Sequence, residues 1–319
     1  MRLVFCGTPQ FAVPTLGHLL GQSDFEIVAV ITQPDRPRGR GQEVSFSPVK
    51  QTALAAGIPV HQPEKIRAPE AQDLFEGLAP DVIVIIAYGQ IIPARLLPIP
   101  QLGWINLHAS LLPKYRGAAP ISWAIVNGET KTGVTTMRID AGMDTGEILL
   151  QEEMGIGPSE TAPDLATRMS ELGAPLMAET LRALAAGGIV PRQQSSEQAS
   201  VAPMLKKEDG RIDWSRPAQE IFNRIRGFAP WPGAYTTFRG QTCHIWGEPA
   251  SNDVSEQNAW QSKTGPGSLL VQRDRAMVCC GDATYLRLLS VKLEGRKQVS
   301  AAEFANGAHL HSGEHFGET

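Results

Sequence analysis

Three polar side chains in the middle of the chain could together support acyl transfer. Asn106 and His108 lie two residues apart, and Asp144 follows between two glycines, Gly142 and Gly146. An asparagine amide can donate a hydrogen bond to a developing oxyanion, a histidine exchanges protons near neutral pH, and an aspartate can orient the histidine. A set of this kind transfers an acyl group without a serine or cysteine nucleophile.

The alternation of residue types predicts where these side chains lie. Asn106 and His108 fall on one face of a strand at 104–108, which ends before the proline at 113. Asp144 follows a second strand, at 133–139. If the sheet is parallel there, Asp144 emerges at the same carboxyl edge as His108. Taken alone, the Asn and His could be polar residues satisfied at a strand end, and the third group favours a functional site.

Around these residues, apolar strand-like runs alternate with helical stretches, which predicts an α/β fold with a Rossmann-like, mostly parallel, doubly wound sheet. We expect strands at 3–7, 25–31, 82–87, 104–108, 133–139 and 147–151, and helices at 11–20, 47–56 and 164–186. The run at 82–86 is apolar on both faces, as in a central strand covered by helices.

After residue 187 the pattern collapses into Gly, Pro, Gln and Ser without a period, which indicates a linker. Beyond it, a helix at 219–228 precedes five short strands at 234–238, 242–246, 268–271, 276–280 and 286–293, typical of a small OB-like β-barrel. We therefore predict a catalytic domain at 1–188, a linker at 189–208 and a second domain at 209–319. The histidine-containing tail is expected to be disordered and not to bind metal.

Composition excludes several other classes of protein. The 319 residues are 42% hydrophobic, enough for a core in each of two domains, and no run approaches the length of a membrane span. The four cysteines lack metal-ligand spacing and are expected to be buried, reduced thiols. Gly7 follows the first strand, but neither a Gly-x-Gly-x-x-Gly fingerprint nor a phosphate-loop lysine accompanies it, so we expect no dinucleotide cofactor. The chain opens on an apolar strand without a charged leader, which indicates a cytoplasmic protein.

The charge is unevenly distributed along the chain. The net charge is −4, and residues 1–205 carry 15 Lys and Arg against 20 Asp and Glu, whereas residues 206–319 carry 14 against 13. Within the acidic part, residues 33–50 form a basic island that contains Arg36, Arg38 and Arg40. The island is either a solvated surface loop or an arm that seeks phosphate groups. A second basic face could form around Lys206, Lys207, Arg224, Arg226, Lys292, Arg296 and Lys297.

Together with Asp144, the block at 106–117 resembles the signature of the folate-dependent formyltransferases. The block reads Asn-Leu-His-Ala-Ser-Leu-Leu-Pro-Lys-Tyr-Arg-Gly. The superfamily includes enzymes that act on glycinamide ribonucleotide, on UDP-aminosugars and on formyltetrahydrofolate itself, so the block indicates the formyl donor better than the acceptor. Segments 32–41, 211–215 and 226–235 resemble the methionyl-tRNA formyltransferase family, as do the start of the chain and its two-domain layout.

The resemblance implies formyl transfer from 10-formyltetrahydrofolate to initiator methionyl-tRNA, which serves translation initiation. It implies that Asn106, His108 and Asp144 are catalytic, and that no metal is needed. By position, the folate-binding loop comprises Ser110, Leu111, Leu112 and Pro113. The expected tRNA contacts are Arg36, Arg38, Arg40, Lys206 and Lys207, of which Arg40 matches the arginine of a flexible loop and Arg38 a position that varies in the family.

Two other functions remain open for this set of residues. The same three catalytic groups would permit transfer of the formyl group to an aminosugar nucleotide or to water. A module that binds tRNA or folate without turnover would also keep the fold, although the intact Asn106, His108 and Asp144 argue against it. We expect the protein to be a monomer that does not bind membranes.

Overall fold

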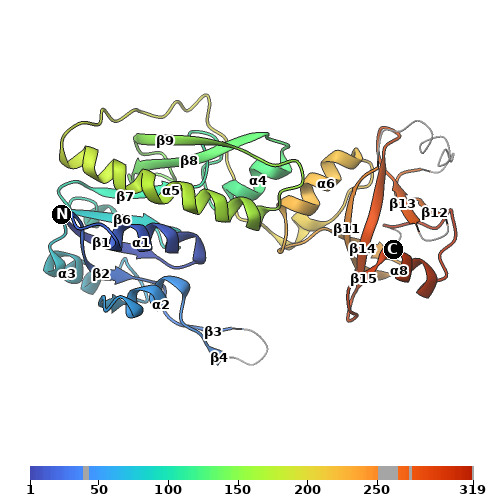
Figure 1. Cartoon of the computed structure of the whole chain (residues 1–319), viewed down its shortest axis with the longest axis horizontal. Helices are drawn as coiled ribbons and strands as arrows, with labels where there is room; N and C mark the ends of the chain where they lie inside the picture. Colours follow the sequence, from blue (N-terminus) through green and yellow to red (C-terminus); the bar gives the residue numbers. More distant parts are fainter. Residues whose placement is uncertain (39–42, 251–264, 273–274, 318–319) are drawn as a thin grey trace. The chain divides into compact units, whose positions relative to one another are not determined.

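The computed structural model describes residues 1–38, 43–250, 265–272 and 275–317 (Figure 1). These residues form two compact units. Unit 1 consists of 1–120, 131–155 and 164–203, and unit 2 of 121–130, 156–163 and 204–319. In the part of the chain that is described, no helix is long and apolar enough to cross a membrane.

Unit 1 is built on a seven-stranded sheet with the order β5-β2-β1-β6-β7-β8-β9. The five strands from β5 to β7 run parallel, whereas β8 pairs antiparallel with β7, and β9 antiparallel with β8. The predicted α/β class with a mostly parallel sheet is confirmed. The strands are β1 (Arg2–Gly7), β2 (Glu26–Ile31), β5 (Val60–His61), β6 (Val82–Ile86), β7 (Trp104–His108), β8 (Lys131–Arg138) and β9 (Ile148–Gly155).

Helices cover both faces of this sheet. Phe75 of α3 (Pro69–Leu78) packs edge-to-face on Trp104, with ring centroids 5.1 Å apart. On the opposite face, α5 (Ala162–Ala185) packs so closely that a Cβ atom on Gly173 would lie 2.4 Å from the Leu107 side chain. Alternation along β7 therefore places Asn106 and His108 on the same face as Trp104. The remaining helices are η1 (Gln10–Ala12), α1 (Val13–Leu20), α2 (Pro48–Ala55) and η2 (Ala94–Leu96).

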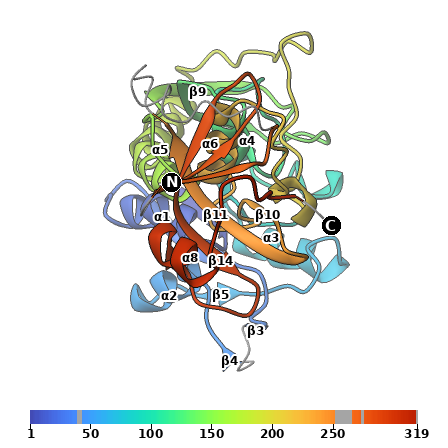
Figure 2. The same cartoon turned by 90° about the vertical axis from the view of Figure 1, so that its right-hand side faces the viewer.

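Unit 2 contains a curled antiparallel sheet with the order β10-β11-β14-β13-β12, and β15 also pairs with β14. The long strands β11 and β14 curve past α8 (Figure 2). This arrangement confirms the predicted OB-like domain. Its elements are η3 (Lys207–Gly210), α6 (Ala218–Gly227), β10 (Tyr235–Phe238), β11 (Gln241–Pro249), β12 (Leu269–Gln272), β13 (Arg275–Cys279), β14 (Tyr285–Leu293), β15 (Val299–Ser300) and α8 (Ala301–Gly307).

The predicted disorder of the C-terminal tail is wrong for the residues up to 317. The tail joins the two ends of the curled sheet, because Phe316 N–H donates to the Gly267 carbonyl beside β12 and Gly317 N–H donates to the Thr237 carbonyl of β10. The Phe316 ring is buried and stacks on Trp214, with centroids 5.6 Å apart. The tail thus belongs to the core of unit 2.

α4 (Pro120–Val126) and the turn at 156–163 pack with α6 inside unit 2. Arg226 is only 6% exposed, and its guanidinium donates to the carbonyls of Gly157 and Glu160 and to Asn223. Arg226 therefore holds this turn and does not belong to an exposed basic face, which corrects that part of the expectation.

All four cysteines are buried and free, as predicted. Burial raises the pKa of the Cys243 thiol to about 12, so that this thiol stays protonated at neutral pH. Among the described residues, no cluster of His, Cys, Asp and Glu could hold a metal ion.

A polar network fixes the base of the short hairpin β3 (Pro37–Arg38) and β4 (Glu43–Val44). Lys50 of α2 forms an ion pair with Asp35 and donates to Gln62 Oε1 at 2.7 Å, and Gln62 Nε2 donates to Asp35 Oδ1 at 3.1 Å. Partial burial raises the pKa of the Asp35 carboxyl. The hydrogen bonds from Lys50 and Gln62 and the charge of Lys50 outweigh that effect, and the pKa lies below its usual value of 3.8.

Replacing Asp35 with Asn should therefore destabilise unit 1 in a pH-dependent way. Because the pKa of Asp35 is lower in the folded than in the unfolded chain, its stabilising effect is complete above pH 3.8 and is lost as the pH falls through the folded pKa. We expect Asp35→Asn to lower the free energy of unfolding by about 1 to 3 kcal/mol at pH 7. The difference from wild type should shrink toward pH 3 in urea titrations. Asp73→Asn, at an exposed site on α3, is the control, and an equal loss at both pH values would contradict the assignment.

Candidate active site

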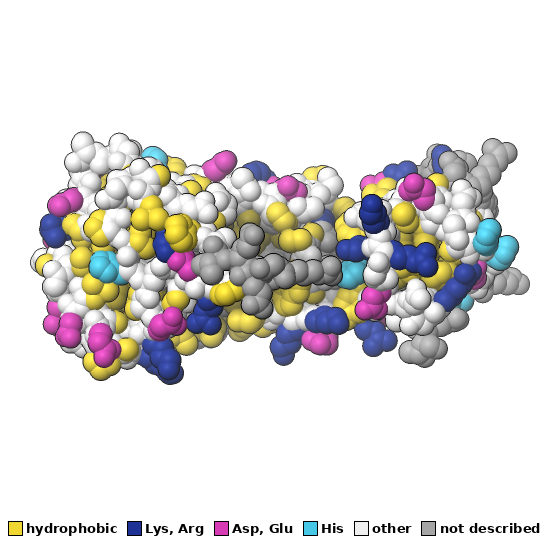
Figure 3. Space-filling model, turned by 90° about the horizontal axis from the view of Figure 1, so that it is seen from below, with side chains coloured by type: hydrophobic (Ala, Val, Ile, Leu, Met, Phe, Trp, Pro, Cys, Tyr) yellow, Lys and Arg dark blue, Asp and Glu magenta, His cyan; other side chains and the backbone are white. Residues whose placement is uncertain are grey.

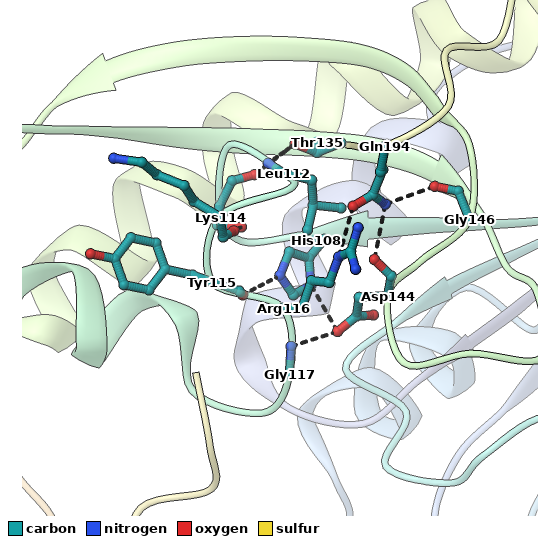
Figure 4. A network of polar contacts seen from close by, with 11 residues as sticks. His108, Leu112, Lys114, Tyr115, Arg116, Gly117, Thr135, Asp144, Gly146 and Gln194 are labelled. Carbon is teal, nitrogen blue, oxygen red and sulfur yellow. Dashed lines mark hydrogen bonds and ion pairs between the residues drawn. The ribbon is translucent and has the colours of Figure 1, made fainter. Parts of the chain in front are cut away.

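His108 is held in one orientation at the carboxyl end of β7. Its side chain is 6% exposed, and its Nε2 lies 2.9 Å from the backbone carbonyl of Tyr115. A carbonyl oxygen can only accept, so Nε2 carries a proton in this contact. The other ring nitrogen, Nδ1, lies 3.6 Å from Asp144 Oδ2 (Figure 4). Nδ1 is therefore the ring nitrogen that does not donate to the backbone, and it faces the Asp144 carboxylate.

Asp144 reaches His108 by a different route from the one predicted. In the antiparallel pairing, His108 lies opposite Thr135 and Asn106 opposite Met137, so that β8 runs toward the amino end of β7. The backbone N–H of Ile139 donates to the Trp104 carbonyl, at that far end. The loop between β8 and β9 must then double back to bring Asp144 to His108. The expectation of a parallel strand at this position is wrong, although the structure does bring the two side chains together.

The Asp144 carboxylate is held by a backbone N–H of the block at 106–117. Its Oδ2 accepts a hydrogen bond of 2.8 Å from the N–H of Gly117. Gly117 has φ +115, and a Cβ atom there would lie 2.7 Å from the carbonyl oxygen of Ala202. Only glycine fits this close approach at this backbone conformation. One backbone stretch therefore holds both groups, through the Tyr115 carbonyl and the Gly117 N–H.

Asn106 lies on the same face of β7 as His108 and is half-buried. Within the described residues, no hydrogen bond joins its side-chain amide to another group. The amide is thus available to donate to an oxygen atom of a bound molecule, as an oxyanion donor must.

The loop that contains Ser110, Leu111, Leu112 and Pro113 is tied down by its own polar neighbours. Ser110 Oγ donates to the Lys114 carbonyl at 2.6 Å. Thr135 Oγ1 donates to the Ser110 carbonyl at 2.6 Å and accepts from the Leu112 N–H at 3.2 Å, and Gln151 donates to the Leu112 carbonyl. The loop is therefore shaped by side chains of β8 and β9 before any ligand binds.

The expected linker contributes contacts that the sequence reasoning missed. Residues 200–202 run beside the block: Arg116 N–H donates to the Ser200 carbonyl at 2.8 Å, and Ala202 N–H donates to the Arg116 carbonyl at 2.7 Å. Upstream, Gln194 contacts the loop that carries Asp144. These contacts are mostly backbone to backbone, and the segment has no periodic signal that could have revealed them.

The predicted tRNA contacts are only partly visible. Arg36 is exposed and forms an exposed ion pair of 3.6 Å with Glu64, and Lys206 and Lys207 are exposed in unit 2. Arg40 lies outside the described residues, as does the side chain of Arg38. Burial lowers the pKa of His244, and the charges of Lys292, its cross-strand partner, and of Lys207 lower it further. Lys and Arg side chains gather over the right-hand part of the surface in Figure 3.

Comparison with known proteins accounts for both units. The family model described as "Formyl transferase" matches residues 1–181, and "Formyl transferase, C-terminal domain" matches residues 204–309. A methionyl-tRNA formyltransferase of Solibacter usitatus is 54% identical over 318 residues, with 100% of this chain and 99% of the relative covered. That of Geobacter sulfurreducens is 48% identical, with 100% and 97% covered.

Solved structures with the same fold are more distant in sequence. The sugar 3N-formyl transferase WlaRD has a TM-score of 0.65 at 19% identity and covers 93% of this chain and 99% of its own. The N-formyltransferase from Helicobacter canadensis has a TM-score of 0.66 at 20% identity, with 90% and 98% covered. These two structures support the fold, whereas the full-length relatives show to which formyltransferases the chain belongs. The chain belongs to the formyl transferase family and, within it, to the methionyl-tRNA formyltransferases.

Proposed function

We propose that this chain transfers the formyl group of 10-formyltetrahydrofolate to the α-amino group of initiator methionyl-tRNA, in the cytoplasm, as a monomer. The observation that carries the chemistry is the approach of His108 Nδ1 to Asp144 Oδ2, on the strand that also carries Asn106, whose amide has no hydrogen bond among the described residues. The acceptor is supported by full-length relatives at about half identity, which are named for methionyl-tRNA. The product, N-formylmethionyl-tRNA, would start translation.

In the proposed reaction, the α-amine attacks the formyl carbon and forms a tetrahedral intermediate. The former carbonyl oxygen gains negative charge, and Asn106 donates a hydrogen bond to it, with help from His108. As the bond from carbon to the folate nitrogen breaks, that nitrogen must receive a proton and the new amide must lose one. His108 Nδ1 exchanges protons, directly or through water, and Asp144 stabilises its charged form.

We assign the donor to the loop of Ser110, Leu111, Leu112 and Pro113, which adjoins His108. Its polar backbone groups are satisfied by Thr135 and Gln151, so that a folate would meet a preformed wall. Residues 1–188 would then supply the chemistry. The donor loop follows β7 directly, and this keeps the formyl carbon within reach of Asn106 and His108.

We assign tRNA binding to the arm that carries Arg36, Arg38 and Arg40, to residues 209–319, and to Lys206 and Lys207 in the segment 189–208 that precedes them. The exposed Arg36, Lys206 and Lys207 support this assignment, because phosphate contacts depend on local charge and not on the net charge of −4. The Asp35–Lys50–Gln62 network fixes one end of the arm. Arg226 is excluded from direct contact because its guanidinium is used inside unit 2.

The alternative acceptors are a UDP-aminosugar and water. One structure with the same fold is a sugar 3N-formyl transferase, and another is an N-formyltransferase in complex with dTDP-3-aminofucose, but they are only 19% and 20% identical to this chain. An assay with labelled 10-formyltetrahydrofolate and each acceptor in turn separates these functions. We expect label in methionyl-tRNA and neither in the sugar nor as free formate. Label in the sugar alone would reject the proposed acceptor.

Replacing Asn106 with Ala should lower kcat for formylation by about 100- to 1000-fold, the usual effect of losing one oxyanion donor. The donor KM should change little, because the interaction strengthens only in the transition state. Asn306→Ala, at an exposed position on α8, is the control. Near wild-type turnover of Asn106→Ala would remove Asn106 from the reaction.

Replacing Arg40 with Ala should raise the KM for tRNA and leave folate affinity unchanged, because phosphate contacts act on the tRNA alone. The affinity for tRNA should also fall steeply with salt, with a shallower slope in the variant. Arg2→Ala is the matched control, since Arg2 lies at the amino end of β1 and pairs with Glu26. An equal loss of folate affinity in Arg40→Ala would show that the arm has another role.

A further inference from the structure

One side chain of the segment 189–208 joins the Asp144 loop to the block at 106–117. Gln194 Nε2 donates to the carbonyl of Asp144 at 2.9 Å and to the carbonyl of Gly146 at 2.7 Å (Figure 4). Its Oε1 accepts a hydrogen bond of 2.9 Å from Arg116 Nε. Gln194 is half-buried, and both ends of its amide are used within unit 1.

The chemistry of the partners fixes the orientation of this amide. The two carbonyl oxygens can only accept, so the NH₂ group must face them, and the Nε of arginine can only donate, so the amide oxygen must face Arg116. A carboxylate in place of the amide would put its oxygens against two carbonyl oxygens. An apolar side chain of the same size would keep the packing and lose all three hydrogen bonds.

The Asp144 loop needs such an anchor because its own conformation is costly. Asp144 has φ +53, in the left-handed region, which a residue with a Cβ atom adopts at a cost of about 1 kcal/mol. β8 ends near the amino end of β7, so the loop must also run back toward the carboxyl end of β7. Its internal bond from Thr145 to Asp140 is exposed, whereas the bonds from Gln194 are partly shielded from water.

The contacts close a ring around the catalytic pair. His108 donates to the Tyr115 carbonyl, and Gly117 N–H donates to Asp144. Arg116, which lies between Tyr115 and Gly117 in the chain, donates to Gln194, and Gln194 donates to the Asp144 carbonyl. Gln194 is therefore linked to Asp144 and His108 through two short backbone segments.

We propose that Gln194 is a positioning residue that sets the approach of Asp144 to His108. The inference rests on the formyl transfer proposed above, in which this pair exchanges protons. Gln194 is hydrogen-bonded to the backbone of the Asp144 loop and to Arg116. It therefore acts through Asp144 and not by touching the substrate. Its effect should appear in turnover and in the state of His108, and not in donor binding.

The test compares Gln194→Met with Gln193→Met in the full chain. Gln193 is the adjacent residue of the same type, is exposed, and donates instead to Glu147 at 3.0 Å. We expect Gln194→Met to lower kcat for methionyl-tRNA by about 10- to 100-fold, the scale of a small misplacement of a catalytic group. Its donor KM should stay within about twofold and its thermal midpoint near wild type. Gln193→Met should match wild type throughout.

A second measurement does not depend on turnover. In ¹⁵N-labelled protein, the ring resonances of His108, assigned by their loss in His108→Ala, should move in Gln194→Met at constant pH and stay in place in Gln193→Met. Unchanged His108 resonances would overturn the positioning role, even if the chain proved to formylate another acceptor. If the resonances move but wild type does not formylate methionyl-tRNA, the proposed function fails and the positioning role stands. Wild-type kcat in Gln194→Met would also overturn the inference.

Discussion

The site depends on bringing a carboxylate back to a histidine against the direction of a strand. Asn106 and His108 lie on one face of the sheet, because side chains alternate along β7 and β7 is paired on both sides, with β6 and β8. β8 leaves toward the opposite edge, so Asp144 must return through the loop that follows. The Gly117 N–H donates to the Asp144 carboxylate of that loop, and the Gln194 amide donates to the Asp144 carbonyl.

This constraint explains why so much of the surrounding backbone is specialised. Gly117 lacks a Cβ atom because the Ala202 carbonyl occupies that space, and Ala202 is there because residues 200–202 pair with the block. The Tyr115 carbonyl, which faces inward, selects the protonated nitrogen of His108. Nδ1 and Oδ2 lie 3.6 Å apart, so the nitrogen to which we assign proton exchange has no short hydrogen bond to Asp144.

Much of the fold and part of the site could be predicted from the sequence, because their signals are local. The apolar run of β6 follows from burial on both of its faces, and the alternation along β7 places Asn106 and His108 on one face. The breaks in unit 2 mark its short strands. Strand direction has no such signal, and the antiparallel β8 was therefore missed. The contacts of the segment 192–202 were missed, and the order of the C-terminal tail was misjudged, for a related reason. Their partners are backbone groups far away in the chain, such as the Gly267 and Arg116 carbonyls, which no periodicity reveals.

The central claim is that Asp144 and His108 act together in formyl transfer to methionyl-tRNA, and single-turnover kinetics test it most directly. In separate reactions, purified wild type or Asp144→Asn, in excess over methionyl-tRNA, would be mixed with that tRNA and labelled 10-formyltetrahydrofolate. The account predicts that wild type labels the tRNA, and that Asp144→Asn labels it at least about 100-fold more slowly, while still binding the tRNA. Equal rates in the two proteins, or no labelled tRNA with wild type, would contradict it.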